Sequence, residues 1–131
     1  MLRATLPAEA RLKKNSDFVF ILKNGKKIDF GNFFIIIASN KLQNYHIEAR
    51  LGIIISKKFA KKAIIRNTLK RIIREFFRKN RALIPKKNYI FRLYKKIPKY
   101  SLMKIKKIIN IELFHQFSRI KNDKKSLNIN N

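Results

Sequence analysis

The 131-residue chain contains no cysteine and only three glycines. Without cysteine it can form neither a disulfide framework nor a thiolate metal site. Three glycines are too few for a glycine-rich phosphate-binding loop. The longest apolar runs, such as FFIIIA at residues 33–38, are far too short to span a bilayer, and the first residues lack the apolar core of a signal peptide. We therefore expect a cytoplasmic protein.

Acidic residues are scarce as well, with seven of them against 33 lysines and arginines. They are scattered singly, so paired carboxylates for acid–base or metal chemistry are not expected; they are Glu9, Asp17, Asp29, Glu48, Glu75, Glu112 and Asp123. No spacing suggests a Ser-His-Asp set. We expect no catalytic and no metal-binding residues, and the pattern favours a binding protein over an autonomous nuclease.

What the chain has in excess is positive charge, with a formal net charge of +26. Its apolar fraction of 46% supports a folded domain rather than a disordered basic tail. Self-repulsion of this size predicts a polyanionic partner, for which RNA, DNA and an anionic membrane surface are the candidates. Five of the ten arginines lie within residues 66–81. Because a guanidinium binds phosphate bidentately, this local concentration argues for a specific site more strongly than the total charge does.

The arginine-rich segment, residues 63–81, has the periodicity of an amphipathic helix. At about 100° per residue, an apolar stripe falls on one side, formed by Ile65, Leu69, Ile72, Ile73, Phe76 and Phe77. The opposite side collects the cations Arg66, Lys70, Arg71, Arg74, Arg78 and Arg81, with the amide of Asn67 among them. The pattern predicts a helix that packs one face against a core and presents the other to phosphates.

The remaining chain predicts a small α+β domain. We expect a short helix between residues 15 and 24, strand structure over 26–38, further strands at 49–56 and 88–94, and a final helix capped by Ser101. The order helix, strands, helix, strand, helix indicates an α+β or two-layer sandwich architecture. We expect one domain over residues 1–120 with a short, weakly anchored N-terminal arm, and a polar, disordered tail at 121–131.

Structured RNA suits this combination better than duplex DNA. The basic helix can cross a phosphate backbone, and aromatic side chains can stack on unpaired bases if they are exposed; the candidates are Phe18, Phe34, Tyr89 and Tyr94. A membrane-surface helix is disfavoured because strands are expected on both sides of it.

The central motif resembles the bacterial ribonuclease P protein subunit. The matching residues are RLGIIISKK at 50–58, Lys61-Lys62-Ala63, and Arg66-Asn67-x-x-Lys70-Arg71-x-x-Arg74-Glu75-x-Phe77-Arg78. Arg11-Leu12-Lys13-Lys14-x-x-Asp17-Phe18 with Gly25 is similar to the family's N-terminal signature. The similarity covers roughly residues 11–118.

The resemblance implies a non-catalytic subunit of an endoribonuclease. In that enzyme an RNA subunit, using Mg²⁺, removes the 5′ leader from precursor tRNA, while the protein binds the RNA subunit and the leader. It also implies a small α/β sandwich in which the basic helix lies in a left-handed crossover. A small ribosomal protein remains the alternative, since it would share the charge, the size and the packing.

The site residues follow from the motif positions. Those expected to contact the catalytic RNA are Arg66, Asn67, Lys70, Arg71, Arg74 and Arg78. Those expected in the leader cleft are Phe18, which matches an aromatic position, Phe34 and Ile36, placed there by strand alternation, and Lys57 and Lys58 at the end of the cleft. Two residues depart from the family pattern: Thr68 replaces an arginine, and Leu22 replaces an aromatic residue of the cleft.

Overall fold

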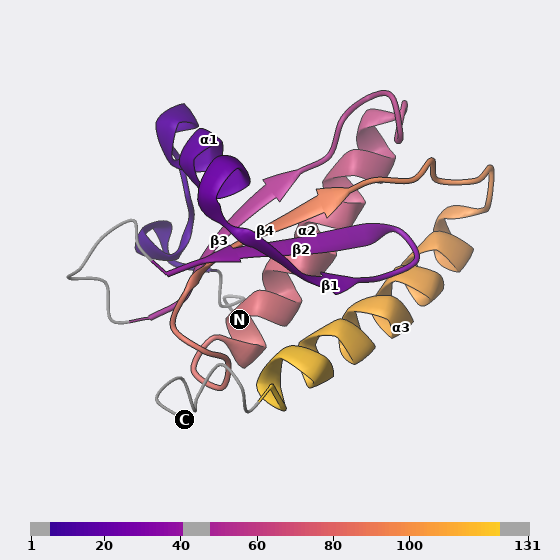
Figure 1. Ribbon diagram of the computed structural model, residues 1–131. Helices are drawn as coiled ribbons and strands as arrows, with labels where there is room; N and C mark the ends of the chain where they lie inside the picture. Colours follow the sequence, from indigo (N-terminus) through magenta and orange to yellow (C-terminus); the bar gives the residue numbers. More distant parts are fainter. Residues whose placement is uncertain (1–5, 41–47, 124–131) are drawn as a thin grey trace.

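The computed structural model describes residues 6–40 and 48–123, and its helices and strands form a four-stranded sheet with helices on both faces (Figure 1). The elements in chain order are η1 (Ala8–Ala10), α1 (Asn15–Asn24), β1 (Lys26–Phe30), β2 (Phe34–Ser39), β3 (Arg50–Ile54), α2 (Ala63–Asn80), β4 (Asn88–Leu93) and α3 (Leu102–Lys121). The expected α+β class and the arginine-rich helix are confirmed.

The sheet is mixed, with strand order β1-β2-β4-β3. β1 pairs with β2 and β2 with β4 in antiparallel fashion, whereas β3 and β4 are parallel. The expected strand structure over 26–38 is a hairpin of two strands, because the chain turns at Gly31. The hydroxyl of Tyr94 donates to the carbonyl of Gly31, and the amide of Gly31 donates to the carbonyl of Phe34, which fixes this turn.

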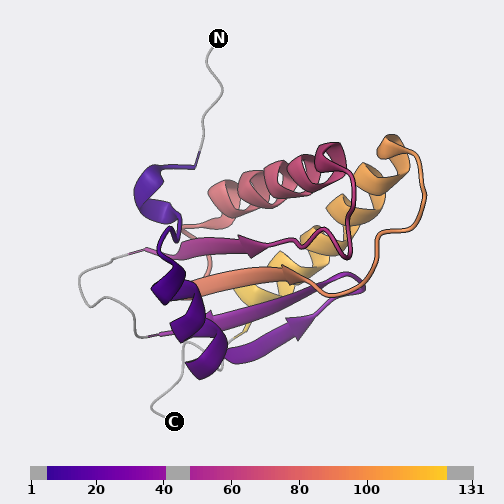
Figure 2. The same cartoon turned by 90° about the horizontal axis from the view of Figure 1, so that it is seen from above.

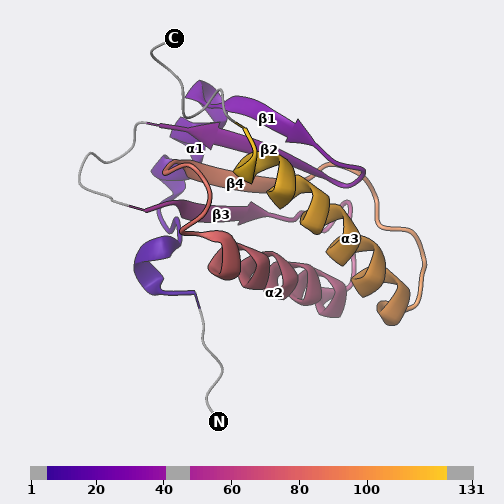
Figure 3. The ribbon, with the colours of Figure 1, turned by 90° about the horizontal axis from the view of Figure 1, so that it is seen from below.

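Helix α2 lies in the connection between the parallel neighbours β3 and β4. Viewed with α2 and α3 in front of the sheet, this crossover is left-handed (Figure 3). Crossovers of this kind are right-handed in nearly all proteins. The left-handed crossover implied by the resemblance is therefore confirmed, and nothing in the hydrophobic pattern foretells it.

The main core lies between the sheet and the two helices α2 and α3. Alternate strand residues face these helices, with Phe34, Ile36, Tyr89 and Phe91 fully buried among them. Phe117 of α3 stacks on Phe91 with ring centroids 5.3 Å apart. The apolar stripe of α2 and the stripe expected on the last helix meet in this core, and Ser101 caps α3 as expected, accepting a hydrogen bond from the amide of Lys104 at 3.2 Å.

A second, smaller core lies on the other face of the sheet. Leu12, Ile21, Ile37 and Ile90 form it, and α1 covers it (Figure 2). The N-terminal segment is also part of the packing. Leu6 and Ala10 are buried in the main core, so the expectation of a weakly anchored arm is wrong for residues 6–10. Of the expected tail, residues 124–131 lie outside the described part of the chain.

One buried carboxylate joins α3 to the β1–β2 turn. Glu112 accepts hydrogen bonds from the backbone amides of Phe33 and Phe34, at 2.9–3.1 Å. One turn further along α3, Gln116 donates to the carbonyl of Phe34 at 3.0 Å. Both side chains are almost inaccessible to solvent. Since unpaired backbone groups at this depth are costly, these contacts fix the edge of the sheet on the helix.

Glu112→Gln is expected to lower the free energy of unfolding by about 1–3 kcal/mol, because one oxygen that faces the amides becomes an N–H donor. Thermal or urea unfolding measures this. Glu9→Gln is the matched control, since it removes the same charge from an exposed position. Equal losses of stability in the two variants would show that the effect comes from net charge and not from the buried hydrogen bonds.

Candidate nucleic-acid interface

The basic face of α2 points away from the sheet. Asn67 and Arg71 are exposed, and Arg66, Lys70, Arg74 and Arg78 are half-buried, while the opposite side of the helix is closed in the core. The structure therefore brings all six expected RNA-contacting residues together on one helix. The amphipathic pattern accounts for Asn67, Arg71, Arg74 and Arg78, since a helix that buries Leu69, Ile73 and Phe77 turns these side chains outward, whereas Arg66 and Lys70 border the buried stripe.

Arg66 also holds the loop that leads into α2. Its Nη1 donates to the carbonyl oxygens of Ala60 and Lys61, at 2.9 and 2.6 Å. These acceptors are uncharged, so the bonds orient the guanidinium without neutralising it. Arg66 thus fixes the basic connection that carries Lys57 and Lys58 as well as contributing charge to α2.

The charge of a second arginine, from the N-terminal segment, acts on Arg74. Burial and the positive charge of Arg11 lower the pKa of Arg74 from its usual value. Arg11 forms a parallel bridge with Leu51 at the edge of the sheet, and its buried Nε has no hydrogen-bond partner among the residues that the structure describes. Two positive charges that act on one another favour an anion near both. In the sequence, Arg11 belongs only to the N-terminal signature, and nothing there indicates that its charge acts on Arg74.

Two further arginines of α2 have partners within the protein. Arg78 donates to Glu75 from Nε and Nη2, at 2.8 and 2.6 Å. Arg81 donates from Nε to the carbonyl of Ala49 at 2.8 Å, which ties the end of α2 to the start of β3. Arg78 is therefore oriented by its ion pair with Glu75, and Arg81 by the carbonyl of Ala49 together with Glu48, whose Oε1 lies 3.4 Å from its Nη1.

On the other face of the sheet, α1 leaves part of the surface open. The register pairs Ile37 with Ile90 and Ile90 with Gly52, and α1 covers this row, with Ile21 packed between Ile37 and Ile90. The next row along the strands consists of Phe30, Ile35, Arg92 and Ile54, paired in register across all four strands. Phe30 and Arg92 are exposed and the two isoleucines are half-buried. We call these four residues the cross-strand row.

Phe18 borders the cross-strand row from α1. Its ring lies against Gly52, where a Cβ atom would be 2.7 Å from Cε1 of Phe18. Only glycine fits at this close approach, so Gly52 sets the depth at which the ring sits. Phe18 is half-buried. Leu22, which stands where the family pattern has an aromatic residue of the cleft, is 39% exposed on the same helix.

Two expected cleft residues lie elsewhere. Phe34 and Ile36 have no exposed surface and face α2 and α3, so their assignment to the leader cleft is wrong. Both faces of β2 are apolar, and alternation cannot tell which one is covered. The informative signal is in β4, where Arg92 shares a face with Ile35 and marks the open side. Tyr89, considered for stacking, is fully buried, and burial raises its pKa.

The remaining positions agree with a surface at the end of β3. Lys57 and Lys58 are exposed and follow this strand directly, beyond Ile54 of the cross-strand row. Thr68 is 3% exposed and donates to the carbonyl of Ile64 at 2.7 Å, so the residue that departs from the family pattern lies on the inner side of α2.

Within residues 6–40 and 48–123, no group of three or more histidine, aspartate or glutamate residues is placed to hold a metal ion. No helix in those ranges is long and apolar enough to cross a membrane.

Comparison with known proteins agrees with this geometry. The family model for Ribonuclease P matches residues 6–121. The ribonuclease P protein component of Bordetella parapertussis is 45% identical over 122 residues, which cover 92% of this chain and 98% of that protein. The corresponding protein of Thermotoga maritima is 42% identical over 76 residues, covering 58% of this chain and 61% of the relative.

Solved structures of this family share the fold. The RNase P protein of Staphylococcus aureus superimposes with a TM-score of 0.67 at 29% identity, covering 86% of this chain and 98% of that one. For the protein from Thermotoga maritima the TM-score is 0.61 at 31% identity, covering 84% and 96%. The small ribosomal protein considered as the alternative is thereby set aside. The chain belongs to the ribonuclease P protein family.

Proposed function

We propose that this protein binds the catalytic RNA of ribonuclease P through α2 and holds the 5′ leader of precursor tRNA along the cross-strand row. The RNA subunit, with Mg²⁺, carries out the cleavage. The observation that supports this most directly is the basic face of α2, which gathers six polar residues on a helix that buries Leu69, Ile73 and Phe77 in the core.

The arrangement on α2 suits a phosphate backbone. Arg71 and Arg74 offer planar forks for bidentate contacts, and Lys70 adds a point charge on the same helix. Asn67 is exposed on the same side, and its amide can donate to and accept from sugar or base edges. In this proposal, the phosphate contacts supply affinity, and Asn67 supplies specificity through its contacts with sugar or base edges.

The open side of the sheet suits a single-stranded leader. Phe18 and the cross-strand row present aromatic and apolar surface to bases, while Arg92 lies in the middle of the row. Lys57 and Lys58 add charge where the row ends. A strip of this composition binds single strands with little sequence preference, because every base has a face that can stack.

The test of the function is reconstitution. Ribonuclease P RNA, precursor tRNA and this protein are mixed at low Mg²⁺, and release of the leader is measured against RNA alone. The protein is expected to stimulate cleavage, because its cations offset the phosphate repulsion that Mg²⁺ otherwise screens. Cleavage equal to that of the RNA alone contradicts the proposal. Cleavage by the protein without the RNA subunit contradicts the assignment of the chemistry to RNA.

Arg71→Ala is expected to weaken binding to ribonuclease P RNA and to reduce the slope of log affinity against log salt by about one. Filter binding over a salt series measures this. Lys23→Ala, which removes an exposed cation of α1, is the control for charge alone and is expected to leave the slope unchanged.

Arg66→Ala is expected to weaken RNA binding and also to lower the melting temperature, because it releases the carbonyls of Ala60 and Lys61.

Arg92→Ala and Phe18→Ala are expected to weaken binding of precursor tRNA to the holoenzyme by about 5-fold while leaving mature tRNA unaffected. The affinities of both tRNAs are measured with reconstituted holoenzyme. Lys107→Ala, on the exposed side of α3, is the matched charge control for Arg92. Equal losses for precursor and mature tRNA would mean that the cross-strand row does not contact the leader.

A further inference from the structure

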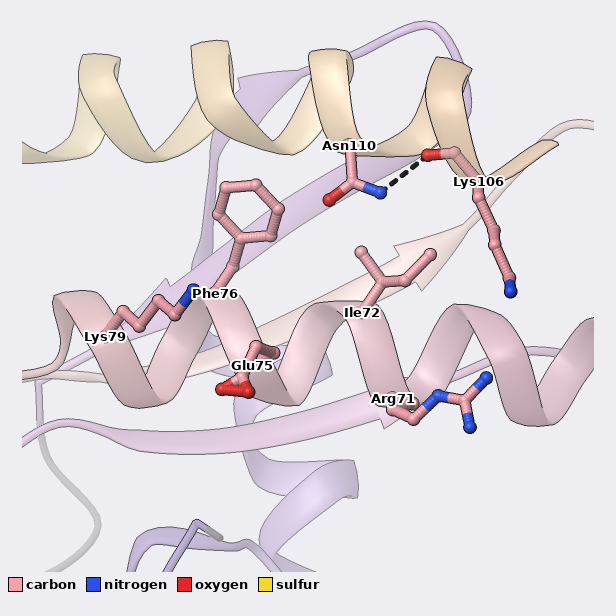
Figure 4. A pocket seen from close by; sticks show the side chains of 7 residues that line it. All are labelled: Arg71, Ile72, Glu75, Phe76, Lys79, Lys106 and Asn110. Atoms are coloured by element: carbon pink, nitrogen blue, oxygen red, sulfur yellow. Dashed lines mark hydrogen bonds between the residues drawn. The ribbon is translucent and has the colours of Figure 1, made fainter. Parts of the chain in front are cut away.

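A groove runs between α2 and α3 on the outer side of the helical layer, away from the cross-strand row. It has a volume of about 580 Å³ and is lined by Arg71, Ile72, Glu75, Phe76, Lys79, Lys106 and Asn110 (Figure 4). Its volume lies within the range of pockets that accept small ligands. The leader proposal makes no use of this groove, and of its lining residues only Arg71 belongs to the RNA-contacting set.

The floor of the groove is apolar. Ile72 and Phe76 project from α2 toward α3 and remain partly accessible (Figure 4). The ring of Phe76 stacks on Phe117 at 5.8 Å with an interplanar angle of 15°, which holds it in place from the core side. A fixed aromatic side chain next to an aliphatic one offers a flat apolar ligand a surface that is already ordered.

The rim of the groove is mainly positive. Arg71 and Lys79 come from α2 and Lys106 from α3, against the single carboxylate of Glu75, which accepts hydrogen bonds from Arg78. The excess of cations selects an anionic occupant over an apolar peptide. An apolar floor with a positive rim matches a nucleotide, whose base is flat and apolar on its faces and whose phosphate is charged.

Asn110 gives the groove a directed polar group. Its Nδ2 donates to the carbonyl of Lys106 at 2.7 Å, one turn earlier on α3. This bond fixes the orientation of the amide and leaves Oδ1 as an acceptor beside Phe76 (Figure 4). An acceptor held in this way can receive a hydrogen bond from the exocyclic amino group of a base.

We propose that the groove between α2 and α3 binds one unpaired nucleotide of the RNA partner. The base lies on Ile72 and Phe76, Asn110 accepts from its edge, and Arg71 and Lys106 contact the flanking phosphates. This rests on the proposed binding of ribonuclease P RNA to α2. Because Arg71 belongs to both surfaces, a strand on the basic face of α2 reaches the groove without a gap. In this arrangement α3 contacts the RNA as well as α2.

Two neighbouring lysines of α3 provide a matched test. Lys106 lines the groove and Lys107 does not, although both are exposed and carry the same charge. With ribonuclease P RNA as the probe, Lys106→Ala is expected to reduce the salt slope of binding by about one, whereas Lys107→Ala leaves it unchanged. Equal slopes in the two variants overturn the proposal.

Asn110→Phe fills the groove with a bulky side chain at an exposed position of α3. It is expected to weaken RNA binding by about 5-fold or more, the loss of one stacked base. Chemical probing of the RNA is expected to show one unpaired base that wild-type protein and Lys107→Ala protect and Asn110→Phe leaves reactive. An unchanged protection pattern overturns the proposal. If Asn110→Phe fails to fold, as judged by circular dichroism, the comparison of the two lysine variants decides.

The outcome separates this inference from the function on which it rests. Wild-type protein that neither binds ribonuclease P RNA nor stimulates cleavage contradicts the proposed function itself. Wild-type protein that binds and stimulates, with groove variants that behave like Lys107→Ala, overturns the groove site alone. In that case an acidic peptide becomes the occupant to examine next.

Discussion

Like-charge repulsion around α2 is the condition that the packing of this protein has to accommodate. The chain has 33 basic residues and seven acidic ones, so most guanidinium and ammonium groups cannot be paired within the molecule. Arg66 instead donates to the backbone carbonyls of Ala60 and Lys61, which orient its guanidinium and leave its charge intact. Burial and the positive charge of Arg11 even lower the pKa of Arg74. The positive field is thus kept at a surface where only a polyanion can offset it.

The sheet separates this charged layer from the surface proposed for the leader. One face of β2 and β4 is closed by α2 and α3, and the other is covered by α1 over only one row of residues. Glu112 fixes the hairpin edge of the sheet on α3, and Gly52 lets Phe18 approach the sheet closely. The two proposed RNA surfaces therefore lie on opposite sides of the sheet, and Arg66 links them because it holds the loop between Lys58 and α2.

Periodicity predicted the elements well and their partners poorly. The helix at Ala63–Asn80, the strands at Arg50–Ile54 and Asn88–Leu93 and the Ser101 cap all follow from local patterns. The single strand region at 26–38 is a hairpin, because the turn at Gly31 is fixed by Tyr94 and Glu112, which are distant in sequence. Alternation cannot assign Phe34 and Ile36 to the buried or to the open face, because both faces of β2 are apolar.

The sequence by itself determined that Arg71, Arg74 and Arg78 lie on the outer side of α2, because a helix that buries Leu69, Ile73 and Phe77 turns these cations outward. It also determined the family, through the spacing of Arg66, Asn67, Lys70, Arg71 and Arg74. Only the tertiary structure decided which residues act on one another: the charge of Arg11 on Arg74, Arg92 in line with Ile35, and the groove between α2 and α3. These depend on strand order and crossover handedness, which arise from contacts between distant segments that no local pattern encodes.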